Sequence, residues 1–136
     1  MAIEKKSKLE ELLELFKLER LDSDQFIGNP GTGGPRLYGG LVAAQATMAA
    51  CLTVEGRDLH SLHGYFLRGG NHDEPIRYIV NRNRDGRSFA SRDVIAYQAG
   101  EAIFRISTSF TVPDEGFDHQ EAIPNAPGPD ELEEWD

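Results

Sequence analysis

The residues of this chain whose types and spacing favour chemistry gather near its middle. His60 and His63 lie three positions apart in a segment patterned as a strand, which predicts that they point to opposite sides. They are therefore not expected to form a two-histidine metal site. His63 is a candidate for contact with a substrate, and an imidazole bonded to neighbouring backbone is the alternative. Asp93 follows Arg92, so its carboxylate is either a base or part of a surface ion pair.

A charge-free segment contains three more candidates. Gln45 is a polar group among apolar residues and needs a hydrogen-bond partner if it is buried. Its amide either positions a water molecule or bonds a strand carbonyl. Gly39 and Gly40 stand where a loop meets the start of a predicted helix, so their backbone N–H groups and the helix dipole would favour an oxygen atom. Close contact between helix and sheet is the other reason for glycine there.

The basic residues divide by type along the chain. All four lysines fall within residues 1–17, whereas seven of the ten arginines fall within residues 68–105. Arg82, Arg84 and Arg87 flank one predicted hairpin, where they either bind phosphate groups in a bidentate manner or form a solvated tip. The single cysteine, Cys51, excludes a disulfide framework and a multi-cysteine metal site.

The elements that must position these residues begin with a short helix over residues 7–18, which Ser7 and Glu10 start as a capping box. Residues 19–27 predict a weak strand with a turn or bulge, and the glycine-rich residues 28–36 predict a mobile loop. Residues 39–54 carry no charge, which is typical of a buried helix.

The rest of the chain alternates between apolar and polar residues, as in strands with one covered face. The predicted strands cover residues 59–67, 76–81, 88–98 and 102–112, with tight turns at Asp85–Gly86 and Ala99–Gly100. We therefore predict an α+β fold in which an antiparallel sheet of five or six strands wraps around one long buried helix.

Composition indicates one domain followed by an acidic segment. The chain has 136 residues, of which 39% are hydrophobic and 27% charged, which is enough for one core and too apolar for disorder. Residues 1–112 hold 14 acidic and 14 basic side chains, so the net charge of −9 comes from nine acidic groups in residues 113–136. That segment also holds four of the seven prolines and is expected to be an extended tail or linker.

Some partners are excluded on the same grounds. The sequence has no nucleic-acid-binding motif, so we expect no nucleic acid partner. Residues 1–18 lack the apolar core of a signal peptide. The longest charge-free run, residues 37–54, is too rich in small and polar residues to span a membrane. We expect a cytoplasmic protein without a membrane partner.

Four segments, in order and with compatible spacing, resemble the acyl-CoA thioesterase II family. They are YGGLVAAQA at 38–46, LHSLHGYFLRGG at 59–70, RDGRSFASRDVIAYQ at 84–98, and SF, P, GF and HQ within 109–120. The resemblance implies the hotdog fold, in which an antiparallel sheet wraps one long helix. That fold agrees with the architecture predicted from periodicity alone.

The resemblance also implies an activity and a site. It predicts hydrolysis of acyl-CoA to a free fatty acid and coenzyme A, without metal or cofactor, at the interface of a homodimer or higher oligomer. Thioester hydrolysis needs donors for the carbonyl oxygen and a base or polar group for the water. The candidates for catalysis are Gly40, His63 and Gln45, and the acyl chain is expected between helix and sheet. The candidates for substrate binding are Gly39, Gly40, Leu41, His63, Tyr65, Arg68, Arg87, Ser88 and Phe89.

One departure from the family pattern bears on the activity. Family members usually contain two hotdog halves, and their catalytic Asp, Ser or Thr, and Gln belong to the second half, which has no counterpart here. Single hotdog thioesterases often place a carboxylate on the central helix instead, and residues 37–54 contain none. The alternative function is therefore a non-catalytic acyl-CoA-binding half that needs a second hotdog domain or subunit. A hotdog hydratase is a weaker alternative, because no Asp–His pair is evident near the helix.

Overall fold

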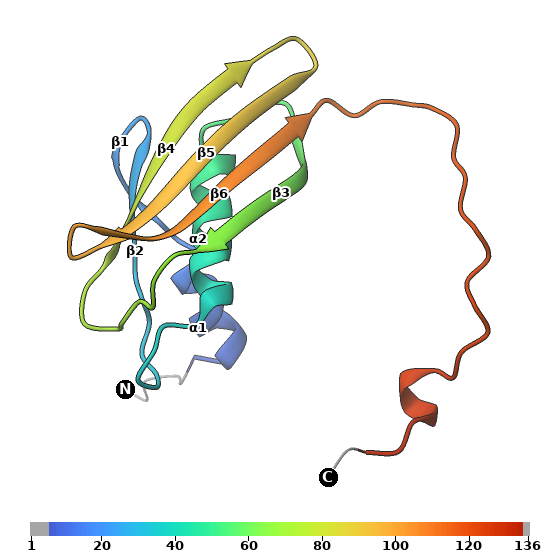
Figure 1. Cartoon of the computed structure of the whole chain (residues 1–136), viewed down its shortest axis with the longest axis horizontal. Coiled ribbons are helices and arrows are strands. Elements are labelled where there is room, and N and C mark those ends of the chain that lie inside the picture. Colours follow the sequence, from blue (N-terminus) through green and yellow to red (C-terminus); the bar gives the residue numbers. More distant parts are fainter. Residues whose placement is uncertain (1–5, 135–136) are drawn as a thin grey trace.

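The alternating segments of the second half of the chain form four long strands in the computed structural model, which describes residues 6–134 (Figure 1). They are β3 (Asp58–Phe66), β4 (Ile76–Asp85), β5 (Phe89–Gln98) and β6 (Glu101–Thr111). Two short strands, β1 (Glu19–Asp22) and β2 (Gln25–Gly28), complete one antiparallel sheet in the order β1-β2-β4-β5-β6-β3. The predicted α+β fold with five or six strands is confirmed, with six strands.

The charge-free segment forms α2 (Gly39–Cys51), which lies against one face of the sheet. Three alanines on its buried side, Ala46, Ala49 and Ala50, are fully covered. Because these side chains are small, the helix axis can approach the strands closely. The sheet leaves one side of α2 open, where Met48 is exposed, so the helix is not covered on every side by the described chain.

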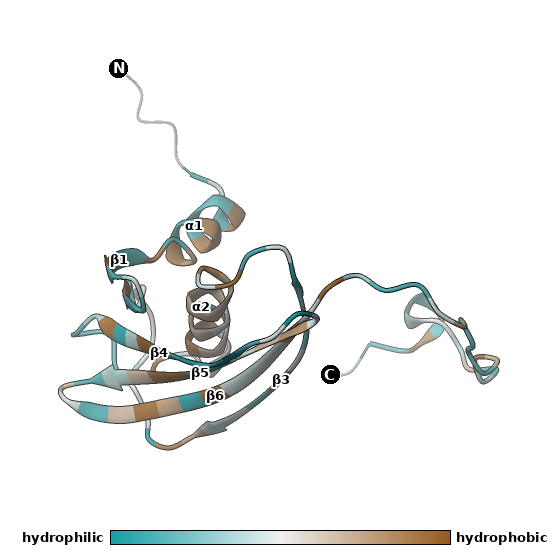
Figure 2. Ribbon diagram, turned by 90° about the horizontal axis from the view of Figure 1, so that it is seen from above, coloured by the Kyte–Doolittle hydropathy of each residue, from teal (hydrophilic) through white to brown (hydrophobic). Residues whose placement is uncertain are grey.

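The first helix, α1 (Lys8–Leu15), begins with the predicted capping box. Glu10 N donates to Ser7 Oγ at 3.2 Å, and Ser7 N donates to Glu10 Oε2 at 2.7 Å. The helix ends at Leu15, three residues before the predicted end, and buries no side chain. It lies on the side of α2 opposite the sheet (Figure 2).

Turns account for the other differences from the predicted elements. Residues 19–27 form a hairpin of two strands rather than one strand, because the chain reverses at Ser23–Asp24. The turn at Asp85–Gly86 is longer than predicted, with residues 86–88 between the strands and Gly86 N donating to Phe89 O at 2.8 Å. The tight turn at Ala99–Gly100 is confirmed, since both residues have positive φ, 49° and 78°.

Beyond the sheet, residues 113–134 run away from the domain as an extended segment with one short 3-10 helix, Pro129–Glu131 (Figure 1). Phe117 is fully exposed in this segment. None of the helices found between residues 6 and 134 is long and apolar enough to cross a membrane.

Candidate functional site

A hollow of about 340 Å³ opens where α2 begins, between the helix and the end of β3. Two contacts hold its rim to the sheet: the N–H groups of Leu67 and Arg68 both donate to Ile103 O, at 2.9 and 3.2 Å. A third contact, from Leu37 N to Gly70 O at 3.1 Å, joins the rim to the loop before α2. Apart from Arg68, the lining side chains are apolar. The hollow is lined by Leu37, Gly39, Val42, Phe66, Leu67, Arg68, Gly69, Gly70, Ile103 and Phe104.

The start of α2 offers backbone donors beside this hollow. Tyr38, the N-cap residue, makes no side-chain capping hydrogen bond, and the first turn contains no acidic residue. The N–H groups of Gly39 and Gly40 and the positive end of the helix dipole are thus available to an oxygen atom. Both glycines also permit close packing, since an added Cβ would lie 3.0 Å from the Phe66 ring at Gly39 and 2.5 Å from the Tyr38 ring at Gly40.

The space deeper between α2 and the sheet is filled. Val42, Ala46 and Phe104 all belong to the buried core cluster. The expectation that an acyl chain lies between helix and sheet is therefore compatible with the structure only at the hollow itself.

Gln45 is fully buried, and its amide is occupied. Its Nε2 donates to Leu15 O at 2.6 Å and to Asn29 O at 2.8 Å, and its Oε1 accepts a hydrogen bond from Tyr78 Oη at 2.8 Å. Burial raises the pKa of Tyr78, so its hydroxyl stays protonated as a donor. The side chain ties α1, the loop after β2 and β4 to the central helix. Its partners are carbonyls of a helix end and a loop rather than of a strand.

His60 and His63 lie on the same face of the sheet, so the prediction that they point to opposite sides is wrong. The register of β3 against β6 shifts around His60, where β3 has one more residue and forms a bulge. The bulge places His60 on the outer face, away from α2, with Nε2 at 2.8 Å from Ser109 Oγ. His63 shares that face with Tyr65, and their rings meet edge to face. None of the three side chains lines the hollow.

The other predicted binding residues divide between the two ends of the sheet. Arg68 lies at the rim of the hollow, where Nη1 donates to Ala102 O at 2.9 Å. Leu41 is buried and does not line the hollow. The segment of Arg87, Ser88 and Phe89 lies at the opposite end, beside the last residues of β6 (Figure 1). Of the predicted binding residues, then, only Gly39 and Arg68 line the hollow, and Gly40 follows Gly39 in the first turn of α2.

A buried cation that the sequence analysis did not single out stabilises the other end of α2. Arg92 is 1% exposed, with Nη2 at 2.6 Å from Asp85 Oδ1 and 3.1 Å from Thr53 O. Its hydrogen bond holds the pKa of Asp85 below the usual value. Asp93 accepts from Ser107 Oγ at 2.6 Å instead of pairing with Arg92, so its predicted surface ion pair is not formed. The last turn of α2 has no basic residue of its own to interact with the negative end of the helix dipole. This absence was the sequence signal that a cation from another element could lie there.

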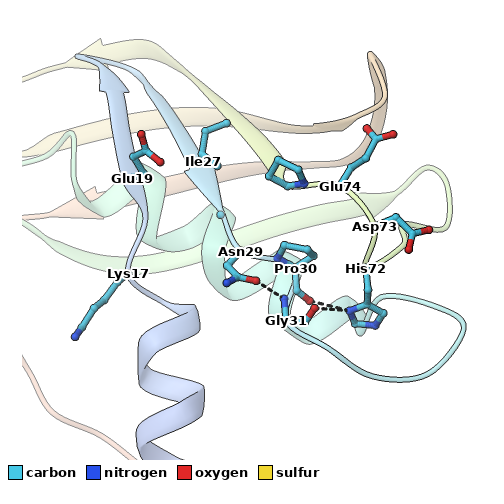
Figure 3. A pocket seen from close by; sticks show the side chains of 11 residues that line it. Lys17, Glu19, Ile27, Asn29, Pro30, Gly31, His72, Asp73 and Glu74 are labelled. Carbon is cyan, nitrogen blue, oxygen red and sulfur yellow. Dashed lines mark hydrogen bonds between the residues drawn. The ribbon is translucent and has the colours of Figure 1, made fainter.

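A second hollow, of about 460 Å³, lies between the loop after β2 and the segment before β4 (Figure 3). His72 holds the loop, with Nδ1 at 3.0 Å from Pro30 O and 3.1 Å from Gly31 O. Because both partners are carbonyls, Nδ1 must carry the proton. Asp73 and Glu74 point away from this contact (Figure 3). In the described part of the chain, no group of three or more His, Cys, Asp or Glu side chains is placed to hold a metal ion.

Comparison with known proteins decides the family. The sequence profile of the acyl-CoA thioesterase N-terminal domain matches residues 28–111, which include α2, the hollow and all the long strands. The chain belongs to this family. This family assignment agrees with the resemblance seen in the sequence motifs.

Relatives of this thioesterase N-terminal domain are longer than the chain itself. Acyl-CoA thioesterase 2 of Haemophilus influenzae is 40% identical over 126 residues, which are 91% of this chain and 44% of that protein. The crystal structure of an acyl-CoA thioesterase II, TesB2, from Mycobacterium marinum is 42% identical and superimposes with a TM-score of 0.77 over 87% of this chain and 44% of that one. The chain thus spans less than half the length of either relative.

The fold also recurs in a more distant protein. A protein of unknown function with a hot dog fold from Alicyclobacillus acidocaldarius has a TM-score of 0.72 at 23% identity, over 88% of this chain and 46% of that one. At this identity the likeness concerns the fold alone. The predicted hotdog architecture is confirmed.

Proposed function

We propose that the chain acts in the hydrolysis of acyl-CoA to a free fatty acid and coenzyme A. The observation that carries the proposal is an apolar hollow directly beside the uncapped start of a charge-free helix. An acyl group would enter the hollow, and the thioester oxygen would accept hydrogen bonds from Gly39 and Gly40. Donors aimed at the developing oxyanion are a large source of catalysis in acyl transfer. The names of the relatives support this substrate class.

The base that activates water must come from outside the hollow. Its ten lining residues include no carboxylate and no imidazole. Gln45 is fully buried with both amide protons donated to carbonyls, and His63 lies on the outer face, so we assign neither of them to catalysis. This observation favours the second candidate function, in which the chain binds acyl-CoA and a second hotdog completes the site.

We infer that β3 is the edge where the second hotdog pairs. It has nine residues and one unpaired edge, whereas the other edge strand, β1, has only four. Leu62 and Tyr65 of β3 are 53% and 58% exposed, and a long unpaired edge strand favours association. Antiparallel pairing of two copies would bring the hairpin of Arg87 toward the helix start of the partner. For this chain alone, we propose a homodimer in the cytoplasm that acts in fatty acid metabolism.

The test is the release of coenzyme A from acyl-CoA by the purified chain over a range of protein concentrations. An enzyme completed by association gains activity per chain as the concentration rises, and EDTA leaves the rate unchanged, because the mechanism uses no metal. A chain that binds acyl-CoA but releases no coenzyme A at any concentration is the non-catalytic half. A chain that does neither contradicts both forms of the proposal.

A further inference from the structure

One aromatic ring closes the inner end of the hollow. Phe104 is 2% exposed, lines the hollow and belongs to the buried core. Its ring lies over Gly64 of the neighbouring strand, where an added Cβ would come within 2.7 Å of Cζ. Any larger residue at that position would displace the ring. The position of this end wall therefore depends on the Phe104 side chain and on the space that Gly64 leaves for it.

A second ring forms the side wall nearest the helix start. Phe66 is 61% exposed, and its ring centroid lies 4.6 Å from that of Phe104 at an interplanar angle of 37°. The same ring lies 3.0 Å from the position of an added Cβ at Gly39. Phe66 thus connects the backbone donors at the mouth with the end wall.

Leu37 and Ile103 bound the remaining side of the hollow. An added Cβ at Gly70 would lie 2.9 Å from Leu37 Cδ2 and 3.2 Å from Ile103 Cδ1. Arg68 is held at the rim by Ala102 O, and its Nε lies 3.4 Å from Glu101 Oε2. The hollow is therefore bounded at its inner end by Phe104, beside the helix start by Phe66, and on the remaining side by Leu37 and Ile103.

We propose that Phe104 limits the length of the acyl group that the hollow accommodates. The inference rests on the proposed function, because it places the thioester at the helix start and the chain in the hollow. A volume of about 340 Å³ is at the low end of the range of small-molecule sites, roughly 300–1,000 Å³. Once the chain reaches the Phe104 ring, further methylene groups no longer fit within the hollow and add no binding energy.

The experiment measures the affinity of the full chain for non-hydrolysable thioether analogues of acetyl-, butyryl-, hexanoyl-, octanoyl- and palmitoyl-CoA by titration calorimetry. Each methylene group that enters the pocket is expected to raise the affinity about fourfold. For the wild-type chain this rise stops among the short analogues. For Phe104→Leu, which shortens the end wall, it continues to a longer analogue.

A matched control separates the end wall from a general loss of packing. Phe26 is also a fully buried phenylalanine on the inner face of the sheet, but it does not line the hollow. Phe26→Leu should keep the wild-type limit, and thermal unfolding shows that both variants are folded. The inference is overturned if Phe104→Leu keeps the wild-type limit, or if the wild-type affinity rises up to the palmitoyl analogue. Binding without any dependence on chain length overturns this inference alone, whereas no binding of any analogue overturns the proposed function as well.

Discussion

At the scale of single residues, Gln45 shows how a candidate for catalysis can be a structural residue. A glutamine in an apolar helix suggests either role, and both are chemically reasonable. The structure gives its amide three hydrogen bonds, which use both N–H protons, and no exposure, so a water molecule in the hollow does not reach it. Its role is to fix α2 relative to two segments that precede it in the chain.

Gln45 and Tyr78 are therefore expected to contribute to stability and not to binding. Tyr78→Phe removes the donor to a buried amide oxygen and should lower the free energy of unfolding by about 1–2 kcal/mol, measured by urea denaturation. Gln45→Met should cost about 2 kcal/mol because the carbonyls of Leu15 and Asn29 and the buried Tyr78 hydroxyl all lose their partner. The affinity of the folded variants for an acetyl-CoA thioether should match that of the wild type. A large loss of affinity with unchanged stability would show instead that Gln45 takes part in binding.

The contact between Arg92 and Asp85 gives a second expectation at this scale. Arg92→Met leaves Thr53 O without its donor and should lower the free energy of unfolding by about 2 kcal/mol, less than for a fully buried pair because Asp85 is half exposed. Urea denaturation at neutral pH measures this loss. An unchanged midpoint would show that the end of α2 needs no buried cation.

The pH dependence of stability follows from the same contact. The folded pKa of Asp85 is depressed, chiefly by the hydrogen bond from Arg92, so its contribution is complete above the unfolded pKa of about 3.9. That contribution is lost as the pH falls through the lower, folded pKa. Asp85→Asn should therefore flatten the fall in stability below about pH 4, as measured by thermal unfolding at a series of acidic pH values. An identical acid limb in the variant would contradict the assignment.

At the scale of elements, the sequence determined most of the fold because periodicity acts over many residues. The alternation along β5 and β6 and the absence of charge in α2 were sufficient to predict the sheet, the helix and their contact. Single-residue features were not visible in this way. The bulge at His60 reverses the side that two histidines face, and nothing in the local sequence signals it.

The exposed edge of β3 leads to an expectation for association. Leu62→Lys places a charge on an unpaired strand edge and should shift the chain toward the monomer in analytical ultracentrifugation. A matched control is Leu9→Lys, which changes a leucine on α1 that is 64% exposed, against 53% for Leu62. Both variants should unfold within about 0.5 kcal/mol of the wild type, because both sites are on the surface. Equal association of the two variants would exclude β3 as the pairing edge.

At the scale of the whole molecule, the charge of the chain is separated from its domain. The nine acidic groups of residues 113–136 account for the net charge of −9, and the described part of this segment, residues 113–134, extends away from the sheet (Figure 1). The candidate site is likewise only partly contained in the chain. The sequence predicted the glycines at the helix start, but the grouping of predicted binding residues at two ends of the sheet depends on topology and was not visible in the motifs.

A chain ended after residue 112 is expected to keep its domain and change its solubility. The midpoint of thermal unfolding should shift by less than about 2 °C, because residues 113–134, the described part of the removed segment, are exposed almost throughout. The shortened chain has a net charge of zero, so its solubility at neutral pH should fall. Circular dichroism and a precipitation series measure the two effects. A large fall in the midpoint would show that the acidic segment stabilises the domain.

The central claim is that an acyl thioester binds at the start of α2. It is tested most directly by nuclear magnetic resonance of the nitrogen-15-labelled chain, titrated with a non-hydrolysable butyryl-CoA thioether. We expect the largest changes in amide shift at Gly39 and Gly40, with smaller ones at Leu67 and Arg68 on the rim. Shifts centred instead on the loop held by His72, or on the outer face around His63, with the amides of the helix start unchanged, would contradict the account.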